Sequence, residues 1–400
     1  MDLDFTLRPG AGLPVSAHRR LREAGPVVWS DSLGGWLVSS YDGVREVLSD
    51  VARFTSAGTP VAEVFGNQGM LVNDTPLHHT IRAVWARQVS AAAMAARAAE
   101  LEGYAAQVLE AVRPRLEAGE RVDFIAVFRA FVMAFVAGSF AVPPERVGVF
   151  ERWSRLSADT PAIEMAEGSE ARQRHFAARQ DVFDLVHEQM AERRARFDRG
   201  EDPQDFIALM VAATGPTGTS GGAITESIAA DNLFNFILGA FDTTEKWLGN
   251  ITAKLYADRG LLADVSADRS LIAPFNEEVM RCECVVQTIQ RRVKCDGVML
   301  AGQAMKQGDP VFVLIGAANR DPARFADADR FDPHRPALPH FGFGAGFHHC
   351  LGLHIVRLEA RIFVNALLDT FPDLRIADMD YGDSWALWGP RTLEMELNAL

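Results

Sequence analysis

Helical periodicity fills the long middle of this 400-residue chain, and no other feature limits its fold as strongly. Between about residues 76 and 265, apolar residues recur every three or four positions, as on the buried face of an α-helix. The clearest helices are expected at residues 91–116, 168–198 and 224–256, with a Gly/Thr/Ser-rich loop at 213–222. Because strands and helices do not alternate, a doubly wound nucleotide-binding fold is disfavoured.

Strand-like segments flank this helical middle on both sides. Ahead of it we expect a helix at 15–24 and strands at 27–29 and 35–39. Behind it we expect a helix at 271–284, β-type segments at 293–300 and 311–315, a helix that follows the glycine-rich loop 341–352 and ends near 370, and a hairpin at 384–400. The pattern predicts a mainly α protein with small β-sheets (α+β). We expect one domain, residues 1–400, with a helix-rich core at about 76–284 and 351–370 and β-rich parts at about 27–60, 285–316 and 384–400.

The charge balance and the cysteines argue against several classes of protein. With 40 Lys and Arg against 53 Asp and Glu, the net charge of −13 opposes broad electrostatic capture of nucleic acid or anionic membranes. The N-terminus has no basic stretch followed by an apolar one, so no signal peptide is expected. Four cysteines are too few and too clustered for a disulfide framework, which predicts a cytoplasmic protein.

One apolar segment, residues 124–142, is almost long enough to span a bilayer. Arg129 lies near its start, Asp123 and Pro143 frame it, and no basic loop flanks it. These features favour a buried core helix, with membrane contact as the alternative.

The segment with the clearest chemistry surrounds Cys350 and reads Phe-Gly-Ala-Gly-Phe-His-His-Cys-Leu-Gly from Phe343 to Gly352. Its glycines let backbone amides approach the sulfur, and the helix that begins here adds partial positive charge. Both effects favour the thiolate, the form that a metal or an electrophile needs. Taken alone, Cys350 is therefore an axial metal ligand, a nucleophile or a buried thiol.

This run resembles the haem-binding loop of the cytochrome P-450 haem-thiolate monooxygenases, Phe-Gly-x-Gly-x-His-x-Cys-x-Gly, at every fixed position. Glu278-Val-Met-Arg281 is similar to the Glu-x-x-Arg helix of the same family, and Arg335 stands where the family has the arginine that completes this pair. Spacing of three puts Glu278 and Arg281 on one helix face. The resemblance spans about residues 27–393, and it implies a fold that buries haem between two long helices, with these three charged residues in a structural role.

A second motif lies inside the expected helix at 224–256. Gly239-Ala-Phe-Asp-Thr-Thr resembles the oxygen-activation segment of the family, which implies that Asp242 and Thr243 are catalytic and relay protons to dioxygen. The competing interpretation, a helix N-cap at Asp242, fits poorly because apolar periodicity continues on both sides. The family usually has glycine where Ala240 stands, and the extra methyl is expected to crowd the oxygen or substrate side.

The resemblance also implies how haem b is bound. Cys350 would ligate the iron through its thiolate, which favours O–O cleavage. His78 and Arg82, one turn apart after Asp74-Thr-Pro76, resemble the helix that grips a haem propionate. The remaining cofactor-binding residues implied by the motifs are Arg291, Phe343, His348 and Gly352.

Matching positions of the family point to a mostly apolar substrate pocket lined by Phe65, Met70, Asn235, Leu238, Gly239, Val286, Ile289 and Thr392. These residues predict a small hydrophobic substrate, and Arg391 is the only candidate to bind an anionic one. The family commonly has proline where Val285 stands, so we expect a less rigid segment there.

The implied activity is insertion of one oxygen atom of O2 into a C–H bond. The chain shows no flavin- or NAD-binding extension, so electrons are expected from a separate ferredoxin and its reductase. Arg87, Arg357 and Arg361, on the two helices expected to flank the cysteine loop, are the proposed docking patch for that ferredoxin, and a monomer is the default expectation. Two alternatives remain: a structural zinc site built from the histidines and cysteines, whose spacing does not suit zinc, and a haem-binding sensor or peroxide-using enzyme.

Overall fold

The computed structural model describes residues 15–62, 66, 68–74, 76–159, 166–384 and 386–398, with backbone alone at 157–159. The chain forms two compact units, each made of separate stretches of sequence. The first comprises Met1–Thr55, Arg97–Ala130 and Thr243–Leu400, and the second comprises Ser56–Ala96 and Phe131–Asp242. Helices α7 (Phe124–Ser139) and α11 (Glu226–Ala257) run from one unit into the other. Because of this continuity we keep the single domain as a prediction.

The first unit holds the cysteine loop on a frame of helices. Its other helices are α1 (Val15–Ala24), α2 (Tyr41–Ser49), α6 (Ala98–Glu117), α12 (Arg259–Ala267), α13 (Ile272–Cys282), α14 (Ile315–Ala318) and α15 (Leu353–Thr370). Helix α15 packs against both α6 and α13. Phe363 of α15 contacts Phe128 of α7 edge to face, with ring centroids 5.2 Å apart, so α15 lies in the apolar core of this unit.

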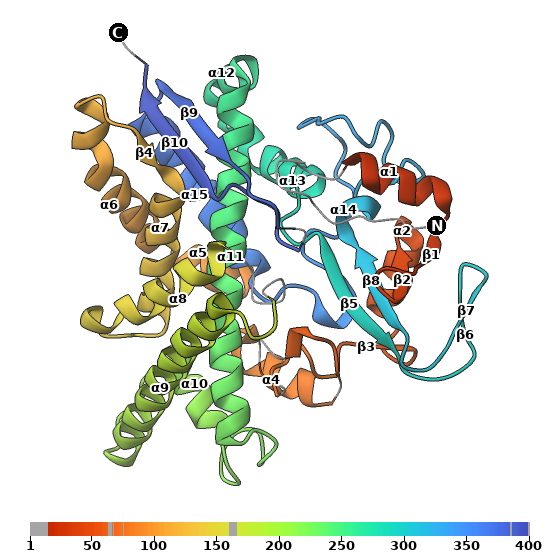
Figure 1. Ribbon diagram of the computed structural model, residues 1–400. Helices are drawn as coiled ribbons and strands as arrows, with labels where there is room; N and C mark the ends of the chain where they lie inside the picture. The colour runs from red at the N-terminus through yellow and green to blue at the C-terminus, as the bar shows by residue number, and fades with distance from the viewer. Residues whose placement is uncertain are drawn as a thin grey trace. The chain divides into compact units, whose positions relative to one another are not determined.

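A five-stranded sheet of the first unit has the order β1-β2-β8-β5-β3, and α1, α2 and α14 pack beside it (Figure 1). Its strands are β1 (Val27–Ser30), β2 (Gly35–Val38), β3 (Phe54–Thr55), β5 (Thr288–Val293) and β8 (Pro310–Leu314). Only the β2–β8 pair is parallel. Two smaller sheets contain β4 (Val122–Asp123), β10 (Thr392–Leu397) and β9 (Leu374–Asp380), and β6 (Val298–Leu300) with β7 (Gln303–Met305).

The second unit is helical. Besides its parts of α7 and α11 it contains α4 (Leu77–Ala86), α5 (Ala91–Ala96), α8 (Gly148–Asp159), α9 (Glu170–Asp198) and α10 (Phe206–Ala213). Helix α9 lies beside both α8 and α10 (Figure 1). Stacked rings of Phe183 and Phe234, 4.6 Å apart, join α9 to α11, and the Trp85 indole of α4 donates to the Phe206 carbonyl at 3.1 Å. Aromatic packing therefore fixes the part of α11 in this unit.

The mainly α architecture with small sheets is confirmed, and four local predictions are wrong. The expected helix at 91–116 is two helices, because Arg97 leaves helical geometry (φ −99°, ψ 8°). Residues 293–300 contain a turn at Gly297 (φ +77°) rather than one strand, and Ile315 starts α14 rather than ending a strand. The C-terminal hairpin pairs β10 with β9, which begins at Leu374, well before residue 384.

The apolar segment at 124–142 is the helix α7, which ends at Ser139. Phe128 and Phe131 are 0% exposed, so their rings are packed inside the protein. Among the helices in the described part of the chain, none is long and apolar enough to cross a membrane.

Candidate functional site

Cys350 lies at the end of a tight loop that leads into α15. Residues Gly346–His348 form a short 3-10 helix, and α15 begins three residues after the cysteine. The Cys350 amide donates to the Phe343 carbonyl at 2.9 Å, so the loop closes on its own first residue. The thiol is half-buried, and a Cβ added to Gly352, the N-cap of α15, would lie 3.9 Å from Sγ. The positive end of this helix therefore favours the thiolate.

Two glycines are required where the loop turns and where it meets its neighbours. Gly344 and Gly346 have φ values of +68° and +64°, a left-handed conformation that strains other residues. A Cβ on Gly346 would also lie 2.4 Å from the Leu48 carbonyl oxygen of α2. The loop therefore packs directly against the backbone of α2. Glycine is needed at these two positions because a side chain would be strained at both and would collide with α2 at Gly346.

The ring of Phe343 joins the cysteine loop to three side chains of the first unit. Trp247 of α11 meets it edge to face, with centroids 5.7 Å apart and an interplanar angle of 85°. The guanidinium carbon of Arg357 lies 5.0 Å from the ring centroid, and the His340 imidazole lies 5.9 Å away. Phe343 is 8% exposed, so its buried ring packs the cysteine loop against α11 and α15.

Glu277 holds two of those side chains in place. Its carboxylate accepts from Arg357 at 2.7 and 2.6 Å and pairs with His340 Nε2 at 3.2 Å, while His340 Nδ1 accepts from the Gly342 amide at 3.1 Å. Burial alone would raise the pKa of Glu277, but the bonds from His340 and Arg357 outweigh it and lower the pKa to about 2. The carboxylate is therefore ionised at neutral pH. Sequence reasoning missed this network, although Glu277 directly precedes the recognised Glu278.

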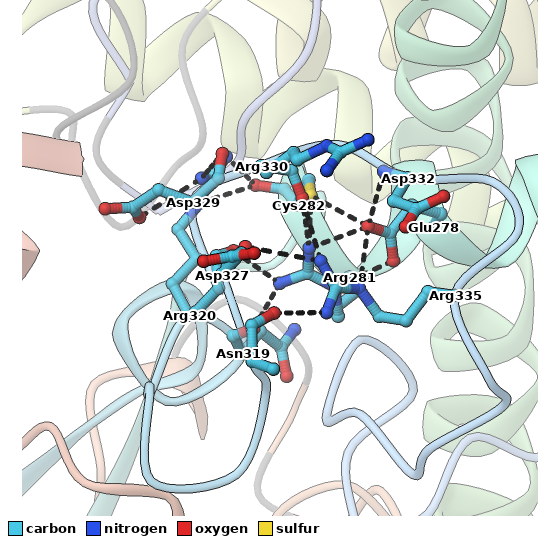
Figure 2. Close-up of polar contacts among 12 residues, drawn as sticks. Glu278, Arg281, Cys282, Asn319, Arg320, Asp327, Asp329, Arg330, Asp332 and Arg335 are labelled. Atoms are coloured by element: carbon cyan, nitrogen blue, oxygen red, sulfur yellow. Dashed lines mark hydrogen bonds and ion pairs between the residues drawn. The ribbon is translucent and has the colours of Figure 1, made fainter.

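Glu278 and Arg281 of α13 form a buried ion pair (Figure 2). Arg335 joins it, with its Nε 3.2 Å from Glu278 Oε1. Arg281 also donates to the carbonyls of Asn319 and Ala328, both at 2.8 Å. Burial would raise the pKa of Glu278, but the bonds from Arg281 hold it below its ordinary value. The cluster fastens α13 to the segment that precedes the cysteine loop.

The middle of α11 has one open face. Most of this helix is buried, yet Gly239 is exposed, Ala240 and Thr243 are half-buried, and a Cβ added to Gly239 would meet no atom within 4 Å. Thr243 follows Gly239 by four residues and Ala240 by three, so it shares one side of the helix with both. Asp242 is buried beside them in the unbroken helix, which excludes an N-cap at that position. The exposed positions are therefore confined to one side of an otherwise buried stretch of α11.

The residues expected to bind the haem propionates lie in both units. In the second unit, His78 and Arg82 are one turn apart on α4, His78 buried and Arg82 half-buried. Burial and then the Arg82 charge lower the pKa of His78 to about 4, so its imidazole is neutral at pH 7. In the first unit, Arg291 is buried on β5, and His348 is half-buried in the cysteine loop. All four are nitrogen donors suited to carboxylates.

Residues expected in the substrate pocket also divide between the units. In the second unit, Met70 is half-buried in a loop, and Asn235 and Leu238 are buried on α11 near Gly239. In the first unit, the residues are Val286 in a bridge to Leu387, Ile289 on β5 and Thr392 at the start of β10, all half-buried. Phe65 lies outside the described residues. Sequence reasoning missed Ser227, Asp231 and Asn232 of α11, which contact the loop that holds Met70.

Two further expectations concern the first unit. The segment after α13 is hydrogen-bonded although proline is missing, because the Trp388 amide donates to the Val285 carbonyl at 2.7 Å and the Gln287 amide to the Ala386 carbonyl at 2.9 Å. The expected loosening at Val285 is therefore not seen in its hydrogen bonding. Arg391 donates to Asp380 at 3.1 and 2.6 Å, so its charge is already paired.

Comparisons with known proteins agree with this geometry. The family model for cytochrome P-450 matches residues 270–374, which hold the ion-pair cluster and the cysteine loop. The cytochrome P-450 monooxygenase PikC of Streptomyces venezuelae is 30% identical over 100% of this chain and 93% of its own length. The biotin biosynthesis cytochrome P-450 of Bacillus subtilis is 28% identical over 95% of this chain and 94% of its own.

Solved structures give the same result. CYP109E1 from Bacillus megaterium, in complex with testosterone, has a TM-score of 0.86 and 26% identity over 96% of this chain and 98% of its own. P450BioI, in complex with an acyl carrier protein ligated to hexadec-9Z-enoic acid, has a TM-score of 0.85 and 25% identity over the same shares.

The chain belongs to the cytochrome P-450 family. It is an oxidoreductase of the monooxygenase class, and its cofactor is haem b. The residues present suit that cofactor: a half-buried thiol beside a helix start, an open face on α11, and paired nitrogen donors on α4. Among the described residues, no cluster of three or more His, Cys, Asp or Glu side chains could hold a metal ion, so the zinc alternative finds no site there.

Proposed function

We propose that this enzyme inserts one oxygen atom of O2 into a C–H bond of a small, mostly apolar substrate, with electrons from a separate ferredoxin and its reductase. The observation that carries the proposal is the Cys350 loop, which closes on Phe343 and leaves a half-buried thiol beside the start of α15. Haem iron bound by a thiolate supplies the oxygen chemistry, because the thiolate pushes electron density that favours O–O cleavage.

The chain's own residues have the following roles in this proposal. Cys350 is the iron ligand, with Phe343 and Gly352 shaping the loop around it. His78, Arg82, Arg291 and His348 bind the propionates. Thr243 holds a hydrogen bond on the oxygen side, and buried Asp242 passes protons inward from solvent. Ala240 adds a methyl to the same open face, which narrows the space beside Thr243.

An apolar substrate is supported by the pocket residues that the structure describes. Met70, Leu238, Val286 and Ile289 are uncharged, and Arg391 is already paired with Asp380. A carboxylate substrate would therefore have to compete with Asp380 for the guanidinium. Similar solved structures hold compounds as different as testosterone and a hexadecenoic acid on an acyl carrier protein, so we expect shape within this apolar lining to decide the individual compound.

Ferredoxin dependence and a cytoplasmic monomer complete the proposal. The chain is acidic overall, so exposed arginines are the natural docking residues for an acidic ferredoxin. Arg87 is the C-cap of α4 in the second unit, and Arg357 and Arg361 lie one turn apart on α15 in the first unit, all three exposed. Because Arg357 pairs with Glu277, Arg87 and Arg361 are the stronger candidates.

The test is the absorption spectrum of the dithionite-reduced, carbon monoxide-treated protein. We expect a strongly red-shifted Soret band, lost in Cys350→Ser and kept in Cys295→Ser, an exposed cysteine that serves as control. Haem absorption without the red shift in the wild type would refute the role of Cys350. Turnover by peroxide alone, with no response to ferredoxin and reductase, would favour the peroxide-using alternative.

A further inference from the structure

The Asn232 side chain binds the backbone of a loop far away in the sequence. Asn232 is on α11 and 0% exposed. Its Oδ1 accepts from the Met70 amide at 2.7 Å, and its Nδ2 donates to the Gln68 carbonyl at 3.2 Å and to the Ile228 carbonyl of its own helix at 2.6 Å. The Asn232 side-chain amide thus donates to the carbonyl of residue 68 and accepts from the backbone N–H of residue 70, as a neighbouring β-strand would.

Two neighbours on α11 strengthen the contact. The Asp231 carboxylate accepts from the Gln68 amide at 3.1 Å, and the Ser227 hydroxyl accepts from the Gln68 side chain at 3.0 Å. Residues 68–73 are also closed internally, because Asn73 Nδ2 donates to the Gly69 carbonyl at 2.8 Å. Two consecutive turns of α11 are therefore involved in holding one short loop.

Glycine makes this close approach possible. A Cβ on Gly69 would lie 2.0 Å from Asn235 Nδ2, and a Cβ on Gly66 would lie 2.6 Å from the Asp231 carboxyl carbon. Asn235 cannot easily move aside, because its Nδ2 donates to the Asp231 carbonyl at 2.6 Å. Any side chain at position 69 would push the loop off the helix.

We propose that Asn232 is a positioning residue of the substrate pocket, which fixes the backbone of residues 68–70 so that Met70 and Asn235 form one preformed wall. The inference rests on the proposed function, because it takes Met70 and Asn235 as pocket residues. In the loop, Asn232 hydrogen-bonds only to backbone atoms, so the side chain at position 70 can change while the loop backbone stays in place. Loss of the Asn232 amide releases the wall itself and weakens binding of any ligand that touches it.

The experiment compares two haem ligands of different size, imidazole and 4-phenylimidazole, by titration of the Soret band. Imidazole needs only the iron, whereas the phenyl group of 4-phenylimidazole also needs the pocket wall. In Asn232→Leu, which keeps the branched shape of the side chain and removes every hydrogen bond, we expect the dissociation constant for 4-phenylimidazole to rise about tenfold with that for imidazole unchanged. Asn232→Asp keeps the acceptor for the Met70 amide and should fall between.

Two further variants complete the design. Gly69→Ala alters the loop instead of the helix, because its methyl would collide with Asn235 and push the loop away from α11. It should weaken binding of 4-phenylimidazole selectively even if Asn232→Leu folds poorly. Gln189→Leu removes another buried amide of the same unit, one on α9 that accepts from Arg193, and should leave both constants unchanged.

An equal loss for both ligands, or no loss in either Asn232→Leu or Gly69→Ala, would overturn the positioning role. If imidazole fails to shift the Soret band of the wild-type protein, the proposed function itself fails, so the two failures are distinguishable.

Discussion

Arg281 donates to both carboxylate oxygens of Glu278, at 2.8 and 2.7 Å, with the two side chains only 2% and 5% exposed. The same guanidinium donates to the carbonyls of Asn319, Ala328 and Arg330 (Figure 2). A buried pair of this kind fixes geometry, because each charge depends on the other for compensation.

Glu278→Gln should lower the free energy of unfolding by about 3–5 kcal/mol, since it leaves the Arg281 charge buried and uncompensated. Urea denaturation followed by circular dichroism measures this change. The matched control is Glu110→Gln, which breaks an exposed pair with Arg113 at the same spacing and should not move the midpoint. Equal effects of the two substitutions would show that the buried cluster does not stabilise the fold.

Gly346→Ala should damage the cysteine loop specifically. The substitution adds a left-handed strain of about 1–2 kcal/mol and also places a methyl 2.4 Å from the Leu48 carbonyl oxygen. Gly382→Ala carries the same strain at φ +65° with no atom closer than 3.9 Å, so it is the control. We expect the carbon monoxide complex of Gly346→Ala to lose much of its red-shifted band and that of Gly382→Ala to keep it. An intact band in both variants would contradict the seating of the loop on α2.

Glu359 should make stability fall as pH rises. Burial in α15 raises its pKa to about 8, with the Arg97 charge opposing. Between its ordinary value of 4.5 and about 8, the unfolded chain releases this proton and the folded chain keeps it. The unfolding free energy therefore decreases in that window by about 1.4 kcal/mol per pH unit from this group. Below pH 4.5 its contribution no longer changes.

Unfolding free energies at pH 5, 7 and 9 test that sign. Glu359→Gln resembles the protonated side chain, so we expect its unfolding free energy to increase relative to that of the wild-type protein as pH rises. Glu102→Gln, at an exposed position of α6, should follow the wild-type slope. A parallel pH dependence of Glu359→Gln and wild type would show that Glu359 is not protonated in the folded protein.

Thr243→Ala should uncouple electron consumption from product formation. Thr243 is on the open face of α11, while its neighbour Thr244 is buried at 2% exposure. With loss of the hydroxyl, we expect product formation to fall about 100-fold, with the reduced cofactor still consumed and peroxide released. Thr244→Val, the adjacent control, should stay coupled. Unchanged coupling in Thr243→Ala would remove this residue from the proton path.

Arg361→Glu should raise the KM for ferredoxin and reduce its salt dependence, without a change in the haem spectrum. Arg361 is exposed and its backbone carbonyl accepts from Asn365, which the substitution preserves. Arg357→Glu is a poor test, because it also breaks the bonds to Glu277. Steady-state kinetics at two salt concentrations measure the effect, and an unaltered KM would exclude Arg361 from the docking surface.

Local chemistry was predictable from the order of residues alone. The helix at 15–24, the start of α15 after the cysteine loop, and the Glu278–Arg281 spacing depend on neighbours within one or two turns. By contrast, β9 was missed because only Leu374 in it is buried, so its alternation is too weak to recognise. The break at Arg97 was missed because a single non-helical residue leaves the apolar spacing of α5 and α6 nearly continuous.

The sequence by itself determined the α-rich class, the cysteine motif and the residues that resemble those of the cytochrome P-450 family. Only the tertiary structure decided which distant groups meet. Glu277 with Arg357, and Asn232 with the backbone of Gln68 and Met70, are separated by 80 and up to 164 residues. No local pattern encodes such contacts, because only the folding of the whole chain brings residues so far apart in sequence within hydrogen-bond distance.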